Sequence, residues 1–135
     1  MRPLTPGGRS EVLATARALA ASGVAVAEIR HSGLVRAQES AEILGEALAP
    51  LQGVHATSGL APEDDPAVAA AELDLAAEPL MLVGHLPHLA RLTVTLLGGA
   101  VEQVAFAPAT AVGLRRHSDG WELELVVPSP AGVRE

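Results

Sequence analysis

Two short segments of the sequence each place reactive side chains at the start of an expected helix. Residues 31–37 read His-Ser-Gly-Leu-Val-Arg-Ala, and residues 84–88 read Gly-His-Leu-Pro-His. Each segment follows a stretch that we expect to be a strand. In an open α/β sheet, such turns lie beyond the carboxyl ends of the strands, where helix N-termini direct free N–H groups outward. The two segments therefore predict an anion-binding site at one edge of a sheet.

Arg36 is the cationic side chain of the first segment. It falls in the first turn of an expected helix, where the positive end of the helix dipole disfavours a cation. That placement becomes favourable if an anion lies between Arg36 and the helix N-terminus. An ordinary exposed arginine is the alternative, and the spacing alone does not decide between the two.

His85 is the titratable side chain of the second segment. It follows Gly84, which lets the backbone approach a ligand closely. An imidazole there could donate to a phosphoryl oxygen or transfer a proton, although the residues alone favour a capping or core histidine. His85 and His88 have a spacing found in metal sites, but no third ligand is evident in the sequence, so we expect neither a metal nor another cofactor.

The remaining polar residues predict an ordinary surface. We expect His55 and His117 to be exposed, and Arg115 and Arg116 to be a solvated charge pair near a hairpin tip. The formal net charge is −7 and the sequence contains no lysine. An acidic surface disfavours nucleic-acid binding, which neutralises phosphates with a basic face. Any phosphate must therefore bind in a small, locally positive pocket.

The length and composition limit the class of protein. At 135 residues, with 49% hydrophobic residues, the chain is expected to form a single domain over residues 1–135. The absence of cysteine excludes disulfides, thiol catalysis and thiolate metal sites. No apolar run approaches the about 18 residues of a membrane span, and the start lacks a signal-peptide pattern, so we expect a cytoplasmic protein with no membrane attachment.

The elements that must position the two segments follow from hydrophobic periodicity and turn residues. The pattern predicts helices from Thr5-Pro6 to Ser22-Gly23 and over 33–48, 67–77 and 87–97, with strands over 24–31, 53–57, 79–83 and 104–107. It also predicts a hairpin of 111–115 and 121–127. The run at 80–83 is continuously apolar and is expected to be buried on both faces. Helices alternating with strands predict a three-layer α/β/α sandwich with a mostly parallel sheet and a C-terminal antiparallel hairpin.

Three segments together resemble the SixA-type phosphohistidine phosphatases of the histidine phosphatase superfamily. Residues 2–8 are similar to that family's R-P-L-T-x-x-G stretch. Residues 31–41 are similar to its S-P-x-x-R-A-x-Q-T segment, and residues 82–87 to its V-x-G/S-H-L-P segment. Their order and separations agree with the family pattern, as does the terminal hairpin, so the resemblance extends over essentially the whole chain.

The resemblance implies a phosphoglycerate mutase-like fold and a phosphatase activity. The family hydrolyses phosphohistidine, or a related phosphomonoester, through a phosphohistidine intermediate. The substrate would be a phosphorylated protein or a small phosphorylated molecule. By position, Arg36 would clamp the phosphoryl oxygens and His85 would be the second catalytic histidine. Ser32 would lie at the pocket edge, and Arg2 would line the substrate groove.

The chain departs from the family pattern at its start. The family's nucleophilic histidine belongs to an R-H-G motif on a first strand upstream of Arg2, and the sequence begins at Met1. The stretch at 30–33 mimics that motif but aligns with the later S-P-x-x-R-A segment. We therefore expect an N-terminally incomplete domain that lacks the nucleophile and the first central strand. A catalytically inactive module that binds phosphate or a phosphoprotein is the alternative function.

A missing central strand would leave neighbouring strands without backbone partners, which is costly for buried N–H and C=O groups. The reading frame could start upstream, the remaining strands could close the gap, or a second chain could fill it. For the 135 residues alone, we expect a homodimer or a distorted sheet.

Overall fold

The computed structural model describes residues 3–98, 109–118 and 120–127, in which helices and strands alternate as the sequence predicts. Arg2 and the strand expected at 104–107 lie outside these residues. The elements are, in order, α1 (Pro6–Ala21), β1 (Glu28–His31), α2 (Val35–Leu48), β2 (Val54–Ala56), α3 (Pro66–Leu75), β3 (Leu80–Val83), α4 (His88–Leu96), β4 (Ala111–His117) and β5 (Gly120–Val127).

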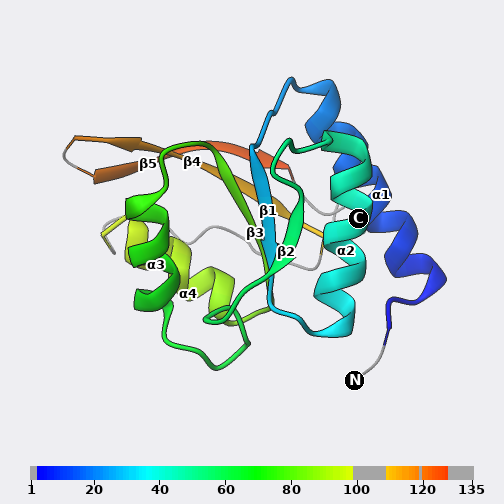
Figure 1. Ribbon diagram of the computed structural model, residues 1–135, viewed down its shortest axis with the longest axis horizontal. Coiled ribbons are helices and arrows are strands. Elements are labelled where there is room, and N and C mark those ends of the chain that lie inside the picture. Colours follow the sequence, from blue (N-terminus) through cyan, green and yellow to red (C-terminus); the bar gives the residue numbers. More distant parts are fainter. Residues whose placement is uncertain (1–2, 99–108, 119, 128–135) are drawn as a thin grey trace, which may run out of the picture.

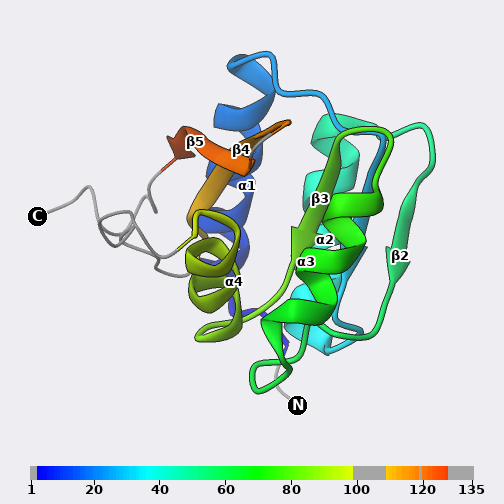
Figure 2. The same ribbon diagram turned by 90° about the vertical axis from the view of Figure 1, so that its left-hand side faces the viewer.

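The sheet is parallel and has the strand order β2-β1-β3. Helices α1 and α2 cover one of its faces, and α3 and α4 cover the other (Figure 1). The antiparallel hairpin of β4 and β5 forms a separate two-stranded sheet, which lies on the β3 side of the parallel sheet (Figure 2). The predicted three-layer α/β/α arrangement with a terminal hairpin is therefore confirmed.

Helix α1 begins and ends where the sequence predicts. Thr5 is the N-cap, and its Oγ1 accepts a hydrogen bond from the amide of Gly8 at 2.9 Å, while Pro6 occupies the first helical position. Ser22 closes the helix. Thr15 Oγ1 in the middle of α1 donates to the carbonyl oxygen of Ala109 at 2.6 Å. That bond ties the start of the hairpin to α1.

The core consists of small and aliphatic side chains in two clusters. The first joins α1, β1 and α2 through Val12, Ala16, Leu19, Ile29, Ala41 and Leu44, and residues of the hairpin pack against its rim. The second joins α3, α4 and the loop after β2 through Leu60, Ala69 and Leu92. With one Trp and one Phe in the whole sequence, helices and sheet must approach closely to fill space.

Two expectations about the strands need correction. The strand predicted at 24–31 starts only at Glu28. Strand β3 is half-buried along its length rather than buried on both faces. The physical reason is that β3 pairs with β1 on one side, and within the described ranges no strand pairs with its other edge.

Across the part of the chain that the structure describes, no helix combines the length and apolar character needed to cross a bilayer.

Candidate functional site

The two segments singled out in the sequence meet at the carboxyl ends of β1 and β3. His31 and Val83 are partners in the parallel register, so the turns that follow these strands start side by side. Ser32 lies in the first turn and His85 in the second. Their side chains are in hydrogen-bond contact, with Ser32 Oγ 2.7 Å from His85 Nε2.

The first turn orients Ser32 through its own backbone. Gly33 has φ of 88°, a left-handed conformation that glycine adopts without strain. The amide of Gly33 donates to His31 Nδ1 at 3.0 Å, and the amide of Leu34 donates to Ser32 Oγ at 3.3 Å. Ser32 Oγ keeps a second lone pair and its hydroxyl hydrogen, so it can either donate to or accept from His85.

Arg36 lies in the first turn of α2 and is exposed. The N-cap residue, Leu34, has no side-chain acceptor for the first amides of the helix. Within the described residues, no carboxylate pairs with the Arg36 guanidinium, because Glu39, one turn later, receives the amide of Leu4 at 2.6 Å and Arg9 at 3.1 Å. The start of α2 therefore presents a cation and amide donors together.

The electrostatic surroundings keep His85 neutral near pH 7. Burial lowers the pKa of His85, and the neighbouring His88 and Arg36 lower it further. A neutral ring has one donor and one acceptor nitrogen. The Ser32 hydroxyl donates to Nε2 when the ring proton is on Nδ1, and it accepts from Nε2 in the other tautomer.

The second turn packs tightly against the loop that follows β2. A Cβ built on Gly84 would lie 3.2 Å from the carbonyl oxygen of Leu60, and Leu60 is completely buried. Glycine at position 84 therefore allows the loop to lie against the turn. This contact fixes the backbone from which His85 projects.

His88 is a buried residue beside this turn. From the sequence it stands out only because its spacing from His85 is found in metal sites. It is 0% exposed, and neither of its ring nitrogens has a hydrogen-bond partner of good geometry within the described part of the chain. The ring lies near the backbone of Gly59, and burial lowers its pKa. Nothing in the local sequence signals this burial, since it depends on the packing of a loop from elsewhere in the chain.

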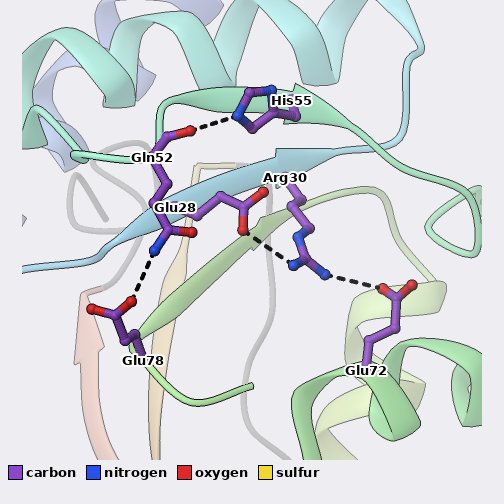
Figure 3. Close-up of polar contacts among 6 residues, drawn as sticks. All are labelled: Glu28, Arg30, Gln52, His55, Glu72 and Glu78. Carbon is purple, nitrogen blue, oxygen red and sulfur yellow. Dashed lines mark hydrogen bonds and ion pairs between the residues drawn. The ribbon is translucent and has the colours of Figure 1, made fainter. Parts of the chain in front are cut away.

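Arg30 lies apart from this arrangement, and His31 takes part only through its Nδ1, which accepts the amide of Gly33 at 3.0 Å. His31 is buried on the side of Glu42 and His55, and burial lowers its pKa. Arg30 pairs with Glu28 at 3.1 Å and with Glu72 of α3 at 3.7 Å, as Figure 3 shows. The resemblance of residues 30–33 to a nucleophile motif is therefore not reflected in the side-chain positions.

His55 and His117 are exposed, as predicted. His55 contacts the carbonyl oxygen of Gln52 within its own turn (Figure 3), and His117 pairs with Glu122 across the hairpin. Both lie apart from the Ser32–His85 contact. Within the described ranges, no three His, Asp or Glu side chains come together as a metal site.

The prediction for Arg116 was wrong. Arg116 is no free surface cation, because its guanidinium donates to the carbonyl oxygens of Leu73, Asp74 and Ala76 at 3.0, 2.6 and 2.9 Å. It thereby caps the C-terminal end of α3. Arg115, on the opposite side of the strand, pairs with Glu124.

A cavity of about 490 Å³ adjoins this cap, lined by Ala70, Asp74, Thr95, Leu96, Arg116, His117, Ser118, Gly120 and Trp121. Helix α4 begins at the Ser32–His85 end with His88 and ends at the cavity with Leu96. The cavity is therefore at the opposite end of the molecule from the two turns.

Comparison with solved structures identifies the fold. No family model and no curated protein matches the chain. A structure of the protein histidine phosphatase SixA complexed with tungstate matches with a TM-score of 0.86 and 20% identity, covering 99% of this chain and 88% of that one. The putative phosphohistidine phosphatase SixA from Agrobacterium tumefaciens matches with a TM-score of 0.78 and 15% identity, covering 94% and 83%. A mycobacterial glucosyl-3-phosphoglycerate phosphatase in complex with VO3 matches with a TM-score of 0.64 and 20% identity, covering 90% and 85%. The predicted phosphoglycerate mutase-like fold is therefore confirmed.

Proposed function

We propose that this chain, which has the fold of the SixA phosphohistidine phosphatases, binds a phosphoryl group at the Ser32–His85 turns and belongs to a phosphatase. Its substrate would be phosphohistidine on a protein, or a small phosphomonoester. The observation that carries the proposal is the contact of Ser32 Oγ with His85 Nε2 at 2.7 Å, next to the helix start that holds Arg36. Two matching structures hold tungstate and VO3, which are oxyanions that resemble phosphate.

The charges at the site suit a phosphoryl group. The whole chain carries a net charge of −7, yet the start of α2 offers a guanidinium and amide donors. The nearest carboxylate along the helix, that of Glu39, is occupied by Leu4 and Arg9. Charge that develops on phosphoryl oxygens during transfer would be stabilised by these donors.

A covalent phosphohistidine intermediate needs a histidine ring that faces the phosphorus atom. Of the histidines, His31 is buried and its Nδ1 accepts the amide of Gly33, and His88 is fully buried. His85 is the histidine whose Nε2 contacts Ser32, which suits the role of proton carrier. We therefore expect the 135 residues to bind the phosphoryl group but to hydrolyse phosphohistidine poorly, since removal of a nucleophile costs several orders of magnitude in rate.

Calorimetric titration with tungstate tests the binding site. Arg36→Gln and His85→Asn should each weaken binding about tenfold or more, because each removes a charged or polar contact to the anion. Arg17→Gln is the matched control, since Arg17 is exposed on α1, and it should bind like the unmodified chain. Equal affinity of all four proteins would overturn the proposal.

The second candidate function is a non-catalytic module that binds phosphate or a phosphoprotein. The observation in its favour is that, of the described histidines, His85 alone contacts Ser32. Turnover of phosphoramidate distinguishes the two functions. Tungstate binding without phosphate release would favour the module, and release that depends on His85 would favour the enzyme.

We also propose that two copies of the 135-residue chain associate. The support is the edge of β3, which no described strand covers. A cytoplasmic location stays a prediction.

A further inference from the structure

Ser32 and His85 form a hydroxyl–imidazole pair with Ser32 Oγ 2.7 Å from His85 Nε2. In the Nδ1–H tautomer of His85 the hydroxyl is the donor of this pair, while Oγ also accepts from the amide of Leu34 at 3.3 Å. A hydroxyl that donates to a neutral imidazole can lose its proton as it attacks an electrophile. Ser32 therefore has the local geometry of an activated nucleophile, beyond the role of supporting the turn.

Other serines of the described chain lack this arrangement. The Ser22 hydroxyl, for example, donates to the carbonyl oxygen of Ala18 within its own helix. Ser32 is the described serine whose hydroxyl contacts a histidine. The pairing is therefore specific to the site.

The pair is also accessible. Ser32 and His85 are both half-exposed, and Gly33 between Ser32 and α2 is exposed. A Cβ on Gly33 would come no closer than 4.0 Å to any described side chain, that of Ala56 being the nearest. A phosphoryl group can thus approach Ser32 Oγ from the side of the helix start, where Arg36 lies.

We propose that Ser32 is a nucleophile that takes a phosphoryl group from a donor with a good leaving group, such as an N-phosphorylated compound. Ser32 Oγ forms a bond to phosphorus while the P–N bond breaks, and the bonding electron pair leaves with the nitrogen. The hydroxyl proton passes to His85 Nε2 and from there to water, while the departing nitrogen, on the opposite side of phosphorus from Ser32, takes a proton from water. The products are phosphoserine at position 32 and a neutral amine.

This inference rests on the proposed phosphoryl site but differs from a histidine intermediate. Arg36 and the amides at the start of α2 would hold the phosphoryl oxygens in either case. The two intermediates differ in chemistry, because a phosphoserine ester survives acid and a phosphohistidine does not. Acid treatment therefore separates the two ideas.

The test is incubation of the 135-residue chain with phosphoramidate, followed by intact mass measurement after acid treatment and by fragmentation of the labelled peptide. We expect one acid-stable phosphoryl group on Ser32. Ser32→Ala should abolish it, and His85→Asn should slow labelling by roughly a hundredfold or more, the usual contribution of a general base. Ser40→Ala, on the following helix α2, is the matched control and should label like the unmodified chain.

Each other outcome overturns the inference. An acid-labile label on a histidine would remove Ser32 as the nucleophile and leave the phosphatase proposal intact. Tungstate binding without any label would leave only a binding site. The absence of both label and tungstate binding would refute the site itself. Mapping the label on the unmodified chain requires no variant to fold.

Discussion

At the scale of single residues, three histidines share one property that follows from where they lie. Burial is the largest cause of a lowered pKa for His31, His85 and His88 alike. Burial disfavours the charged imidazolium, because water solvates that ion better than the protein interior does. The folded protein therefore holds all three rings neutral near pH 7, and protonating them lowers the free energy of unfolding.

Because the pKa values of these three histidines are lowered in the folded state, we predict that the protein loses stability in mild acid. A histidine with a folded pKa below its unfolded value of about 6.5 binds fewer protons in the folded state, so stability rises with pH in that window. The contribution is complete above about pH 6.5 and is lost as the pH falls through the folded pKa values. The urea midpoint should therefore be lower at about pH 5.5 than at about pH 7.5. Equal midpoints at the two pH values would contradict the assignment of neutral rings.

His88 gives a second prediction at this scale. Its ring is fully buried, and neither nitrogen has a hydrogen-bond partner of good geometry in the described chain, although the backbone of Gly59 lies near the ring. An apolar side chain of similar size removes the cost of those polar atoms, so His88→Leu should raise the free energy of unfolding by about 1–2 kcal/mol. The exposed His55→Leu is the control and should change it by less than about 0.5 kcal/mol. Destabilisation by His88→Leu in urea unfolding would show that a ring nitrogen makes a bond the geometry does not reveal.

The sequence predicts part of this site because residue type and position relative to a strand end are local properties. Ser32 and His85 follow two parallel strands, so their proximity was foreseeable once the strands were recognised. The burial of His88 was not foreseeable, because the loop that covers it comes from residues 59–61, far away in the sequence. Packing between distant segments has no signature in a single local pattern.

At the scale of elements, helix α2 carries Arg36 and must be held firmly against the sheet. Ala37, Ala41 and Leu44, which lie on one face of the helix, are buried, and Leu48 at its end is half-buried. The closest approach occurs at Gly45, where an added Cβ would lie 2.7 Å from Val54 Cγ2 of β2. The absence of a side chain at position 45 therefore sets the distance between α2 and β2.

Gly45→Ala should destabilise the fold although alanine favours helix. The new methyl overlaps the branched and stiff Val54, and overpacking of this kind costs about 1–3 kcal/mol. Gly7→Ala in α1 is the matched control, because its Cβ would meet nothing closer than 3.9 Å; it should stabilise by up to about 1 kcal/mol. Thermal unfolding of both variants checks the pair. If Val54→Ala restores the stability that Gly45→Ala loses, the loss is due to this contact. An unchanged stability of Gly45→Ala would refute the predicted overlap.

The hairpin shows the limit of element prediction from sequence. Its two strands and turn were foreseeable from alternation and turn residues, and the structure confirms them. The roles of Arg115 and Arg116 were not, because neighbouring residues of a strand face opposite sides. Arg115, on one side, pairs with Glu124 within the hairpin, and Arg116, on the other side, donates to carbonyl oxygens at the end of α3. Only docking of the hairpin on a helix decides which arginine becomes a cap.

At the scale of the whole molecule, no strand among the described residues pairs with the outer edge of β2 or of β3. The amide of Ala27 donates to the carbonyl oxygen of Pro79 at 2.8 Å, so position 79 faces β1. Backbone groups alternate sides along a strand, so the N–H groups of Leu80 and Leu82 face away from β1. The layers and the hairpin were predictable from the sequence. The unpaired edge of β3 could be recognised only once the strand order was known.

An exposed strand edge is a template for another strand, and we predict that two copies of the 135-residue chain pair through β3. A closed pair with two-fold symmetry places the two β3 strands antiparallel, so that the backbone groups of each edge form hydrogen bonds with those of the other.

Sedimentation should show a dimer fraction that grows with concentration, and the amides of Leu80 and Leu82 should resist hydrogen exchange only when the dimer forms. Leu80→Pro removes one edge N–H at the first residue of the strand, where proline is tolerated, and leaves the amides that face β1. It should shift the equilibrium toward monomer. A monomer at every concentration with both amides already protected would mean that the chain covers its own edge.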